Sequence, residues 1–376
     1  MHALTEEPES APPRGLDRLG GSNAPPRGRL DSLTGLRFVA AFSVFGLHAL
    51  NYGDSTWGDE LFLAGTTGVS FFFIVSGYVM SWTARDGDRA RLFFRRRFAR
   101  VYPAYAVTWV LSLVVMVAAG RRPSLVDAVP LSLLQSWVPS ESVYWATNAV
   151  FWTLSCEAFF YLTFPWLHRV VGTWGVRRTW AAAVAVVAVI EAISLGAWLA
   201  GNGAVVHWVA VVFPVTRAAE FALGVLLGHA ATRGARWSPP LAAAVALAGA
   251  AFLLAGHVPA AFRDVAVTVV PFAVLIWAAA QADLAGRRSP FRSRPVVLLG
   301  TWSYAFYLVH SLVMMTFFEA LRRVGVGADT LSGAPLLVAL SAALVLAVTA
   351  AWLLHRVVEV PMERLLRPRR AVAPPA

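Results

Sequence analysis

Residues 30–50 read LDSLTGLRFVAAFSVFGLHAL, and this stretch decides the fold because it places an arginine and a histidine inside an apolar segment. Arg37 and His48 stand eleven residues apart. Eleven residues are about three helical turns, so on a helix both side chains point to the same side, roughly 16 Å apart along the axis. Ionisable side chains are costly inside a membrane helix and usually serve a function there. The stretch therefore indicates a membrane helix that carries chemistry.

The overall composition also indicates a membrane protein. The chain has 376 residues, of which 58% are hydrophobic and 14% charged, and its mean hydropathy is +0.61. A soluble protein of this length could not bury so much apolar surface. The single cysteine, Cys156, excludes an internal disulfide and any metal site built from several cysteines. We expect no metal site and no permanently bound cofactor.

Apolar segments of spanning or near-spanning length recur along the whole chain. Ten can be drawn, at 35–50, 61–83, 101–119, 151–168, 178–200, 206–230, 239–257, 262–282, 297–320 and 333–357. The sequence thus predicts an all-α, polytopic membrane bundle of about ten transmembrane helices over residues 31–366, between disordered tails at 1–30 and 367–376. Connections 84–100 and 120–150 are long enough to hold interfacial or re-entrant pieces, so the number of spans stays open.

The distribution of positive charge predicts the topology. The net charge is +11, and all 32 basic residues are arginines. Arginine-rich and arginine-poor connections alternate; segment 84–100 holds seven arginines, whereas 51–60 and 201–205 hold none. Positively charged loops stay on the cytoplasmic side of a membrane. The alternation predicts a protein of the cytoplasmic membrane with both termini in the cytoplasm, and it argues against nucleic-acid binding.

An arginine cluster follows the second apolar segment, on the predicted cytoplasmic side. Arg96, Arg97 and Arg100 lie in FFRRRFARVYPAY, residues 93–105, which we expect to be a loop. Guanidinium groups bind phosphates through paired, charge-assisted hydrogen bonds. The cluster is therefore a candidate site for a phosphorylated ligand. The alternative is an ordinary topology signal that also attracts anionic lipid.

Glu157 is the carboxylate that we expect near His48. It lies early in segment 151–168, which should run from the outer side inward, so it is predicted at the depth of His48. An intramembrane carboxylate needs a partner, and an imidazole or an arginine is the obvious one. His48 suits a general base because imidazole titrates near neutrality. Glu157 would orient His48, stabilise its charged form or hold a substrate hydroxyl, and the alternative is a purely structural ion pair.

Two further polar groups lie inside apolar segments. Arg217 and Glu220 are three residues apart, so they can pair along one helix. Tyr304 and Tyr307 share a helix face, and so do Tyr307 and His310, because each pair is three residues apart. Each group is a candidate for substrate contact or support. The alternatives are a self-neutralised pair and polar contacts between helices.

Taken together, the motifs of this chain resemble those of the acyltransferase-3 family of integral membrane O-acyltransferases, over roughly residues 30–365. The motifs that carry the resemblance are, in order, RLDSLTGLRFVAAFSVFGLH, GVSFFFIVSGYVM, RRFARVYP, WTLSCEAFFY, RAAEFALG, SYAFYLVH and VEVPMERL. The chain departs from the family at Cys156, where an aliphatic residue is common, and at Ala158, where a second acidic residue is frequent. Glu157 between them is retained.

The resemblance implies a reaction and a donor. Family members transfer an acyl group, usually acetyl, from cytoplasmic acyl-CoA to a hydroxyl, usually of a sugar at or beyond the outer leaflet. It implies that Arg37 and His48 are essential and that the Arg-Arg-x-x-Arg motif at 96–100 handles the donor. We therefore expect a membrane O-acetyltransferase with His48, Arg37 and Glu157 as catalytic residues and acyl-CoA as co-substrate.

The expected partners are acyl-CoA, a cell-surface carbohydrate or related glycosylated acceptor, and the lipid bilayer. One alternative belongs to another functional class, namely a transporter or flippase of a sugar or lipid-linked precursor. In that case Arg217, Glu220 and His310 would line its pathway.

Overall fold

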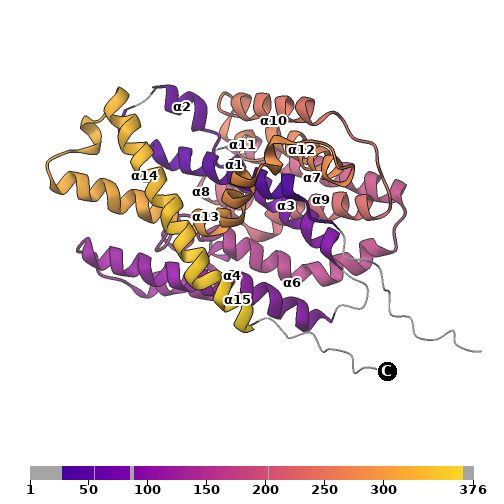
Figure 1. Cartoon of the computed structure of the whole chain (residues 1–376), viewed down its shortest axis with the longest axis horizontal. Helices are drawn as coiled ribbons and strands as arrows, with labels where there is room; N and C mark the ends of the chain where they lie inside the picture. Colours follow the sequence, from indigo (N-terminus) through magenta and orange to yellow (C-terminus); the bar gives the residue numbers. More distant parts are fainter. Residues whose placement is uncertain (1–27, 55, 85–88, 202, 367–376) are drawn as a thin grey trace, which may run out of the picture.

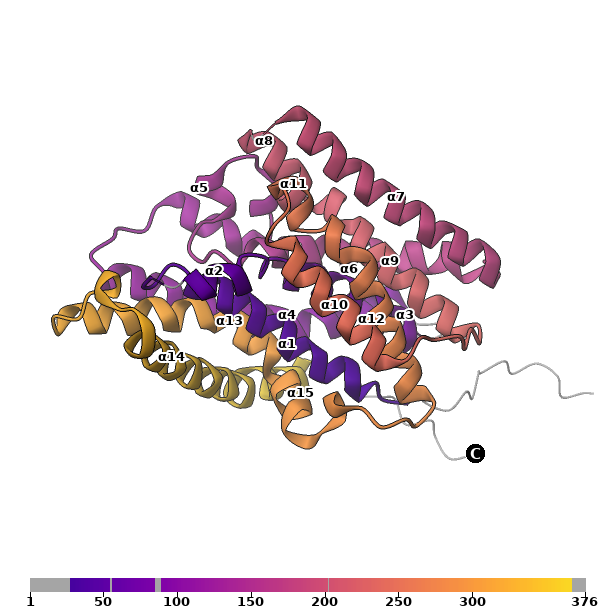
Figure 2. The same cartoon turned by 90° about the horizontal axis from the view of Figure 1, so that it is seen from above.

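The structure is a computed structural model of the chain, and it describes residues 28–54, 56–84, 89–201 and 203–366. Within these ranges the chain is helical without strands, and one isolated bridge joins Asp54 to Ser332. The longer helices are α1 (Asp31–Ala49), α3 (Thr67–Thr83), α4 (Ala90–Ala118), α6 (Trp152–Gly172), α7 (Val176–Ala200), α9 (Pro214–Thr232), α10 (Leu241–Ala255), α12 (Ala266–Leu284), α13 (Arg294–Arg323) and α14 (Gly333–Leu354). The shorter ones are α2 (Thr56–Phe62), α5 (Glu141–Tyr144), α8 (Ala204–His207), α11 (Ala260–Arg263) and α15 (Val360–Leu366). Figures 1 and 2 show one bundle, with α13 and α14 on one side and α7 on the other.

The predicted membrane helices correspond to the helices of the structure. Each of the ten expected segments overlaps one of the long helices. Among the described residues, eight helical stretches are long and apolar enough to cross a membrane, and α6 and α10 are not among them. The all-α membrane bundle is therefore confirmed, whereas the number of ten spans stays a prediction. The expected tails lie outside the described residues, apart from 28–30, where Leu30 is buried.

Glycines bring α3 and α9 together at the centre of the bundle. A Cβ atom on Gly77 of α3 would meet the carbonyl oxygen of Phe221, and a Cβ atom on Gly224 of α9 would meet that of Ile74. Helices in membranes associate through close packing at small residues, because lipid supplies no hydrophobic drive between them. These glycines therefore set the distance between the two helices.

This contact leads to a prediction about stability. Gly224→Leu is expected to lower the melting temperature of the detergent-purified protein, because overpacking a close contact costs about 1–3 kcal/mol. Gly249→Leu is the matched control, since nothing lies within 4 Å of a Cβ atom at this position of α10. Equal melting temperatures for the two variants would show that α3 and α9 can accommodate the larger side chain without loss of stability.

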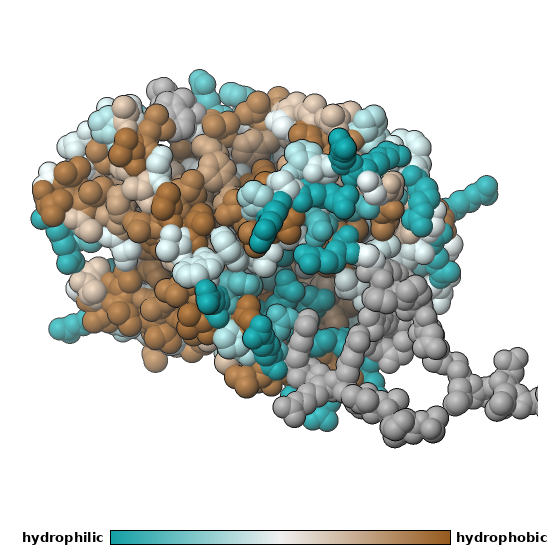
Figure 3. Space-filling model, viewed as in Figure 1, coloured by the Kyte–Doolittle hydropathy of each residue, from teal (hydrophilic) through white to brown (hydrophobic). Residues whose placement is uncertain are grey.

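The two ends of the bundle differ in charge. The arginine-rich end contains the start of α1, where Ser32 Oγ donates to Asp283 at the end of α12 over 2.7 Å. The opposite end contains the bridge between Asp54 and Ser332. Most of the described arginines near a helix end lie at the arginine-rich end, namely Arg29, Arg89, Arg91, Arg95, Arg96, Arg97, Arg100, Arg169, Arg177, Arg178, Arg233, Arg236, Arg287, Arg288, Arg292, Arg294, Arg356 and Arg364. The opposite end has Arg121, Arg122, Arg263, Arg322 and Arg323. Figure 3 shows hydrophilic residues gathered toward one end of this face and apolar residues over much of the rest.

The connection between α4 and α6 folds back into the bundle. Trp109 Nε1 donates to the carbonyl oxygen of Asp127 over 2.8 Å, and the Tyr102 hydroxyl donates to that of Leu131 over 3.1 Å. The connection thus runs antiparallel to α4, from the opposite end toward the middle of the bundle. A re-entrant piece was one of the expected possibilities for 120–150. Because the connection returns to the middle of the bundle, α6 begins inside the bundle rather than at its edge.

Candidate functional site

Arg37 is the centre of a charged group inside the bundle. The charges that act on it come from three other elements: Arg100 of α4, Glu157 of α6, and Glu359 in the π-helical turn His355–Glu359 that follows α14. Arg37 is only half-buried although helices surround it. It is therefore not fully enclosed by the helices that carry these charges.

Arg97 joins the same group from α4. Its Cζ atom lies 5.5 Å from the ring centre of Phe93 and 5.8 Å from that of Tyr161. Glu157 and Arg100 are among the charges that act on it. Arg96 is half-buried and Arg100 is exposed.

The arginine cluster lies on a helix, so the expectation of a loop was wrong. Helix α4 begins at Ala90, ahead of all three arginines. Residues 90–100 contain neither Gly nor Pro, and eight of the eleven are Arg, Ala or Leu, which favour helix. The spacing of 96, 97 and 100 then makes the third arginine a neighbour of the first two on one side of α4.

Glu157 lies with Arg37 and not with His48. The Tyr161 hydroxyl, one turn further along α6, is within hydrogen-bonding reach of its carboxylate, and the charges of Arg37, Arg97 and Arg100 act on it. The expected depth was wrong because the re-entrant connection makes α6 begin inside the bundle. Glu157, which the sequence analysis placed next to His48, thus lies instead near Arg37, three helical turns from His48 along α1.

Positive charge exceeds negative charge in this group. Arg37, Arg97 and Arg100 face the carboxylates Glu157 and Glu359, and Glu359 Oε2 already lies 2.6 Å from His355 Nδ1. Guanidinium groups bind anions such as phosphates through paired, charge-assisted hydrogen bonds. The group can therefore hold an anionic ligand that approaches from the arginine-rich end.

Glu359 and Tyr161 are members of this group that the sequence did not single out as site residues. Glu359 lies in the motif VEVPMERL, to which no site role was assigned. Its position in a π-helical turn was not visible in the sequence, although such turns are frequent at functional sites. Glu157 and Tyr161 are four residues apart on one helix, and this spacing could have suggested their contact.

His48 belongs to a second group, toward the opposite end of α1. Its ring centroid lies 5.0 Å from that of His310 on α13. His48 is half-buried, whereas His310 is fully buried. The rings of Phe45 and Phe306 also pack against His310, at 6.3 and 5.6 Å. A partly accessible imidazole backed by a sealed one can take a proton from a group that reaches it.

The predicted polar face of α13 contacts three different helices. The Tyr304 hydroxyl donates to the carbonyl oxygen of Val101 on α4 over 2.9 Å. The Tyr307 hydroxyl lies 3.0 Å from that of Thr153 on α6. His310 faces α1. Because Tyr304 also lies within electrostatic range of Glu157, this face of α13 runs from the Arg37 group to His48.

Arg217 and Glu220 form a buried ion pair on α9. Their Nε and Oε2 atoms lie 3.0 Å apart, and each side chain is 2% exposed. Arg217 also donates to Ser70 of α3 over 3.3 Å and lies over the ring of Phe73 at 5.1 Å. In the part of the chain that the structure describes, the pair shows no contact with Arg37 or His48. This arrangement favours the structural alternative for the pair.

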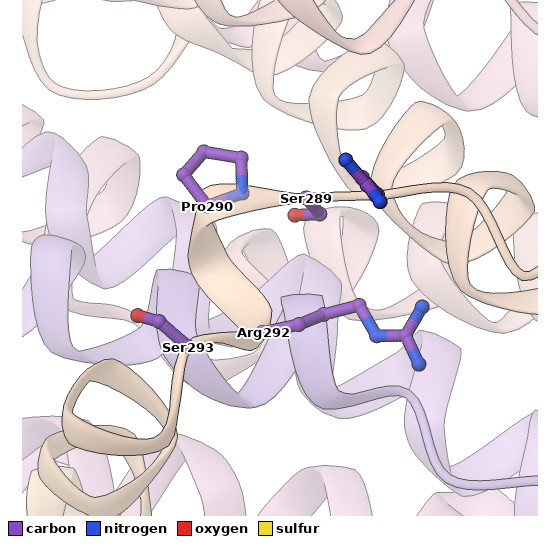
Figure 4. Close-up of a pocket in the computed structure, with 5 residues that line it drawn as sticks. Ser289, Pro290, Arg292 and Ser293 are labelled. Atoms are coloured by element: carbon purple, nitrogen blue, oxygen red, sulfur yellow. The ribbon is translucent and has the colours of Figure 1, made fainter.

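An open hollow on the surface at the arginine-rich end is separate from the charged group. It is lined by Arg288, Ser289, Pro290, Arg292 and Ser293, between α12 and α13 (Figure 4). Arg292 Nε lies 3.5 Å from Asp283 Oδ1, so one of its two arginines is already paired. The hollow is therefore a second, weaker place for an anion.

Comparison with known proteins gives the family. The profile of the acyltransferase domain matches residues 30–356. Acyltransferase MdmB of Streptomyces mycarofaciens is 38% identical over 93% of this chain and 96% of its own length. Exopolysaccharide production protein ExoZ of Rhizobium meliloti (strain 1021) is 29% identical over 83% and 94%, and nodulation protein 10 of Rhizobium leguminosarum bv. viciae is 30% identical over 48% and 53%.

No solved structure matches the chain. The sequence comparisons nevertheless cover nearly all of the helical bundle, including α1 and its Arg37 and His48. The resemblance that the motifs predicted is confirmed by this coverage, and the chain belongs to the acyltransferase-3 family of membrane acyltransferases.

Proposed function

We propose that this acyltransferase moves an acyl group, an acetyl group in the simplest case, from cytoplasmic acyl-CoA to a hydroxyl of a carbohydrate or glycosylated acceptor at the outer face of the cytoplasmic membrane. One observation carries the proposal. An excess of arginine surrounds Arg37 toward the arginine-rich end, and His48 lies about 16 Å further along the same helix. The positive-inside rule assigns the arginine-rich end to the cytoplasm.

The acceptor class rests on the relatives. One of them is named as an exopolysaccharide production protein. A hydroxyl on such an acceptor would reach His48 from the opposite end of the bundle, where the imidazole is partly accessible. Mass spectrometry of surface glycans and secreted metabolites, with and without the gene, should show one species that loses an acetyl mass.

The donor would be held by its phosphates. Arg96, Arg97 and Arg100 present guanidinium groups at the arginine-rich end, and Arg37 lies next to them. The pantetheine arm would then extend along α1 toward His48. Arg37 and His48 are three turns apart and cannot touch one carbonyl group, so Arg37 would act on the charged part of the donor and His48 on the acceptor.

The transfer follows from these positions. His48 takes the proton of the acceptor hydroxyl, the oxygen bonds to the carbonyl carbon of the thioester, and the carbon–sulfur bond breaks. The coenzyme thiolate then takes the proton from the imidazolium. The sealed thiol of Cys156, whose Sγ lies 3.4 Å from the carbonyl oxygen of Val212, gives no support to an acyl intermediate on sulfur.

The buried ion pair on α9 gives no support to transport either. A pathway for a sugar would need polar side chains that are open to the passing ligand. Arg217 and Glu220 are each 2% exposed and neutralise one another. The acyltransferase reading therefore accounts for the site better than a carrier does.

The donor site can be tested by binding. The double variant Arg97→Ala/Arg100→Ala is expected to weaken acetyl-CoA binding to the detergent-purified protein at least about tenfold, because hydrogen bonds to charged groups contribute roughly 1.5–3 kcal/mol each. Equilibrium binding of radiolabelled acetyl-CoA measures the change. The matched control is Arg287→Ala/Arg288→Ala, which removes two exposed arginines at the same end.

Two outcomes would contradict the proposed donor site. Loss of binding in the control, with the Arg97/Arg100 variant unaffected, would move the phosphates to the hollow of Figure 4. A wild-type protein that neither binds nor turns over any acyl-CoA would exclude this class of donor.

A further inference from the structure

We propose that His310 is a positioning residue that holds His48 in the tautomer a general base requires. The proposal rests on the role of His48 in the proposed function and extends it. It assigns to a second imidazole the task that the sequence assigned to Glu157.

The hydrogen bonds of His310 define its own tautomer. Its Nδ1 atom lies 3.2 Å from the carbonyl oxygen of Phe306 and 2.9 Å from that of Tyr307. A carbonyl oxygen only accepts, so Nδ1 must carry a hydrogen. In the neutral ring Nε2 then bears a lone pair and can only accept.

This lone pair is buried and has no donor. Nε2 of His310 has no hydrogen-bond partner among the residues that the structure describes, and the side chain is fully buried. An unsatisfied buried acceptor is costly, and natural proteins keep few of them. A donor that forms a hydrogen bond to Nε2 during the reaction would explain why this atom has no partner in the structure.

His48 is the neighbouring ring that can fill this position. Within the described ranges, four rings pack against His310, namely His48, Phe45, Phe306 and Tyr307. Of these rings His48 alone has an N–H, and the Tyr307 hydroxyl is engaged with Thr153 at 3.0 Å. With the two imidazole centroids 5.0 Å apart, a small rotation of His48 or one bridging water connects the nitrogens.

The contact gives each nitrogen of His48 one task. One ring N–H donates to His310 Nε2, so the other nitrogen keeps its lone pair and faces the accessible side, where the acceptor hydroxyl arrives. A hydrogen-bonded partner that fixes the tautomer in this way is a recurrent device of imidazole bases. His310 itself gains no proton, because the proton of the hydroxyl passes through His48 to the leaving thiolate.

Two near-isosteric variants separate this role from a structural one. In His310→Gln the amide oxygen can occupy the place of Nε2 and still accept. In His310→Asn the amide nitrogen can occupy the place of Nδ1 and keep the bonds to the backbone, but the acceptor is lost. We expect His310→Gln to retain most of the wild-type kcat, and His310→Asn to lower kcat by about 10- to 100-fold.

The KM for acetyl-CoA should stay unchanged in both variants, since the arginine group is intact. Melting temperatures control for folding. A His310→Asn variant with wild-type kcat, or one more active than His310→Gln, would overturn the proposal by showing that only the Nδ1 bonds matter.

A double-variant cycle covers the case in which both substitutions reduce kcat. If His310 acts through His48, His310→Asn should cause no further loss in a His48→Ala background, whereas additive losses would overturn the proposal. The proposed function fails separately, if His48→Ala alone keeps the wild-type rate. The inference alone fails if His48→Ala is inactive while His310→Asn is not.

Discussion

Replacing His48 by alanine is expected to lower kcat for acyl transfer by about 10²- to 10⁴-fold, the contribution of a positioned general base. The binding of acetyl-CoA should not change, because His48 lies three helical turns from Arg37. Transfer of radiolabelled acetyl groups by the purified protein measures the first quantity, and equilibrium binding measures the second. His257→Ala is the matched control, since this histidine is exposed at the same end of the bundle.

The opposite result for His48 would be decisive. A folded His48→Ala protein that acylates its acceptor at the wild-type rate cannot use this imidazole as its base. Loss of acetyl-CoA binding in the same variant would instead place the donor's phosphates near His48, against the charge distribution of the bundle.

The second large effect concerns Arg37. Arg37→Gln is expected to weaken acetyl-CoA binding by about 30-fold or more, because truncating one partner of a buried charge pair costs roughly 2 kcal/mol at least. Arg37→Lys should fall between this variant and the wild type, since an ammonium keeps the charge but lacks the planar fork of donors. Arg169→Gln removes an exposed arginine at the same end and is the control.

Arg37→Gln should also lower the melting temperature, because Glu157 loses a neighbouring cation. The double variant Arg37→Gln/Glu157→Gln removes both charges and should recover much of the stability without recovering binding. If kcat at saturating donor falls while binding is unchanged, the thioester itself lies at Arg37, and the division of roles between Arg37 and His48 is wrong.

Local patterns in the sequence predicted much of this architecture. The apolar segments predicted the long helices, and the spacing within SYAFYLVH predicted that Tyr304 lies on the same side as Tyr307, and Tyr307 on the same side as His310. Both features depend only on the period of a helix. The motif order likewise predicted the family, which the comparisons confirm.

The pairing of side chains from different helices could not be predicted in the same way. The depth of Glu157 depends on where α6 begins, and this is decided by a connection that turns back along α4. The contact between His48 and His310 depends on how α1 packs against α13. The arginines at 96–100 indicated a loop because charge was weighed as a topology signal, whereas the local residues favour helix.

The arginine group also has a consequence for the exchange of coenzyme A for acyl-CoA between turnovers. On the proposed function it grips the nucleotide end of the coenzyme, a part that acyl transfer leaves chemically untouched. Free coenzyme A would therefore bind the arginine group about as firmly as acyl-CoA, and the two would compete for the site. The extent to which the acceptor is acylated would then follow the ratio of acyl-CoA to free coenzyme A in the cell, and so would depend on the metabolic state of the cell.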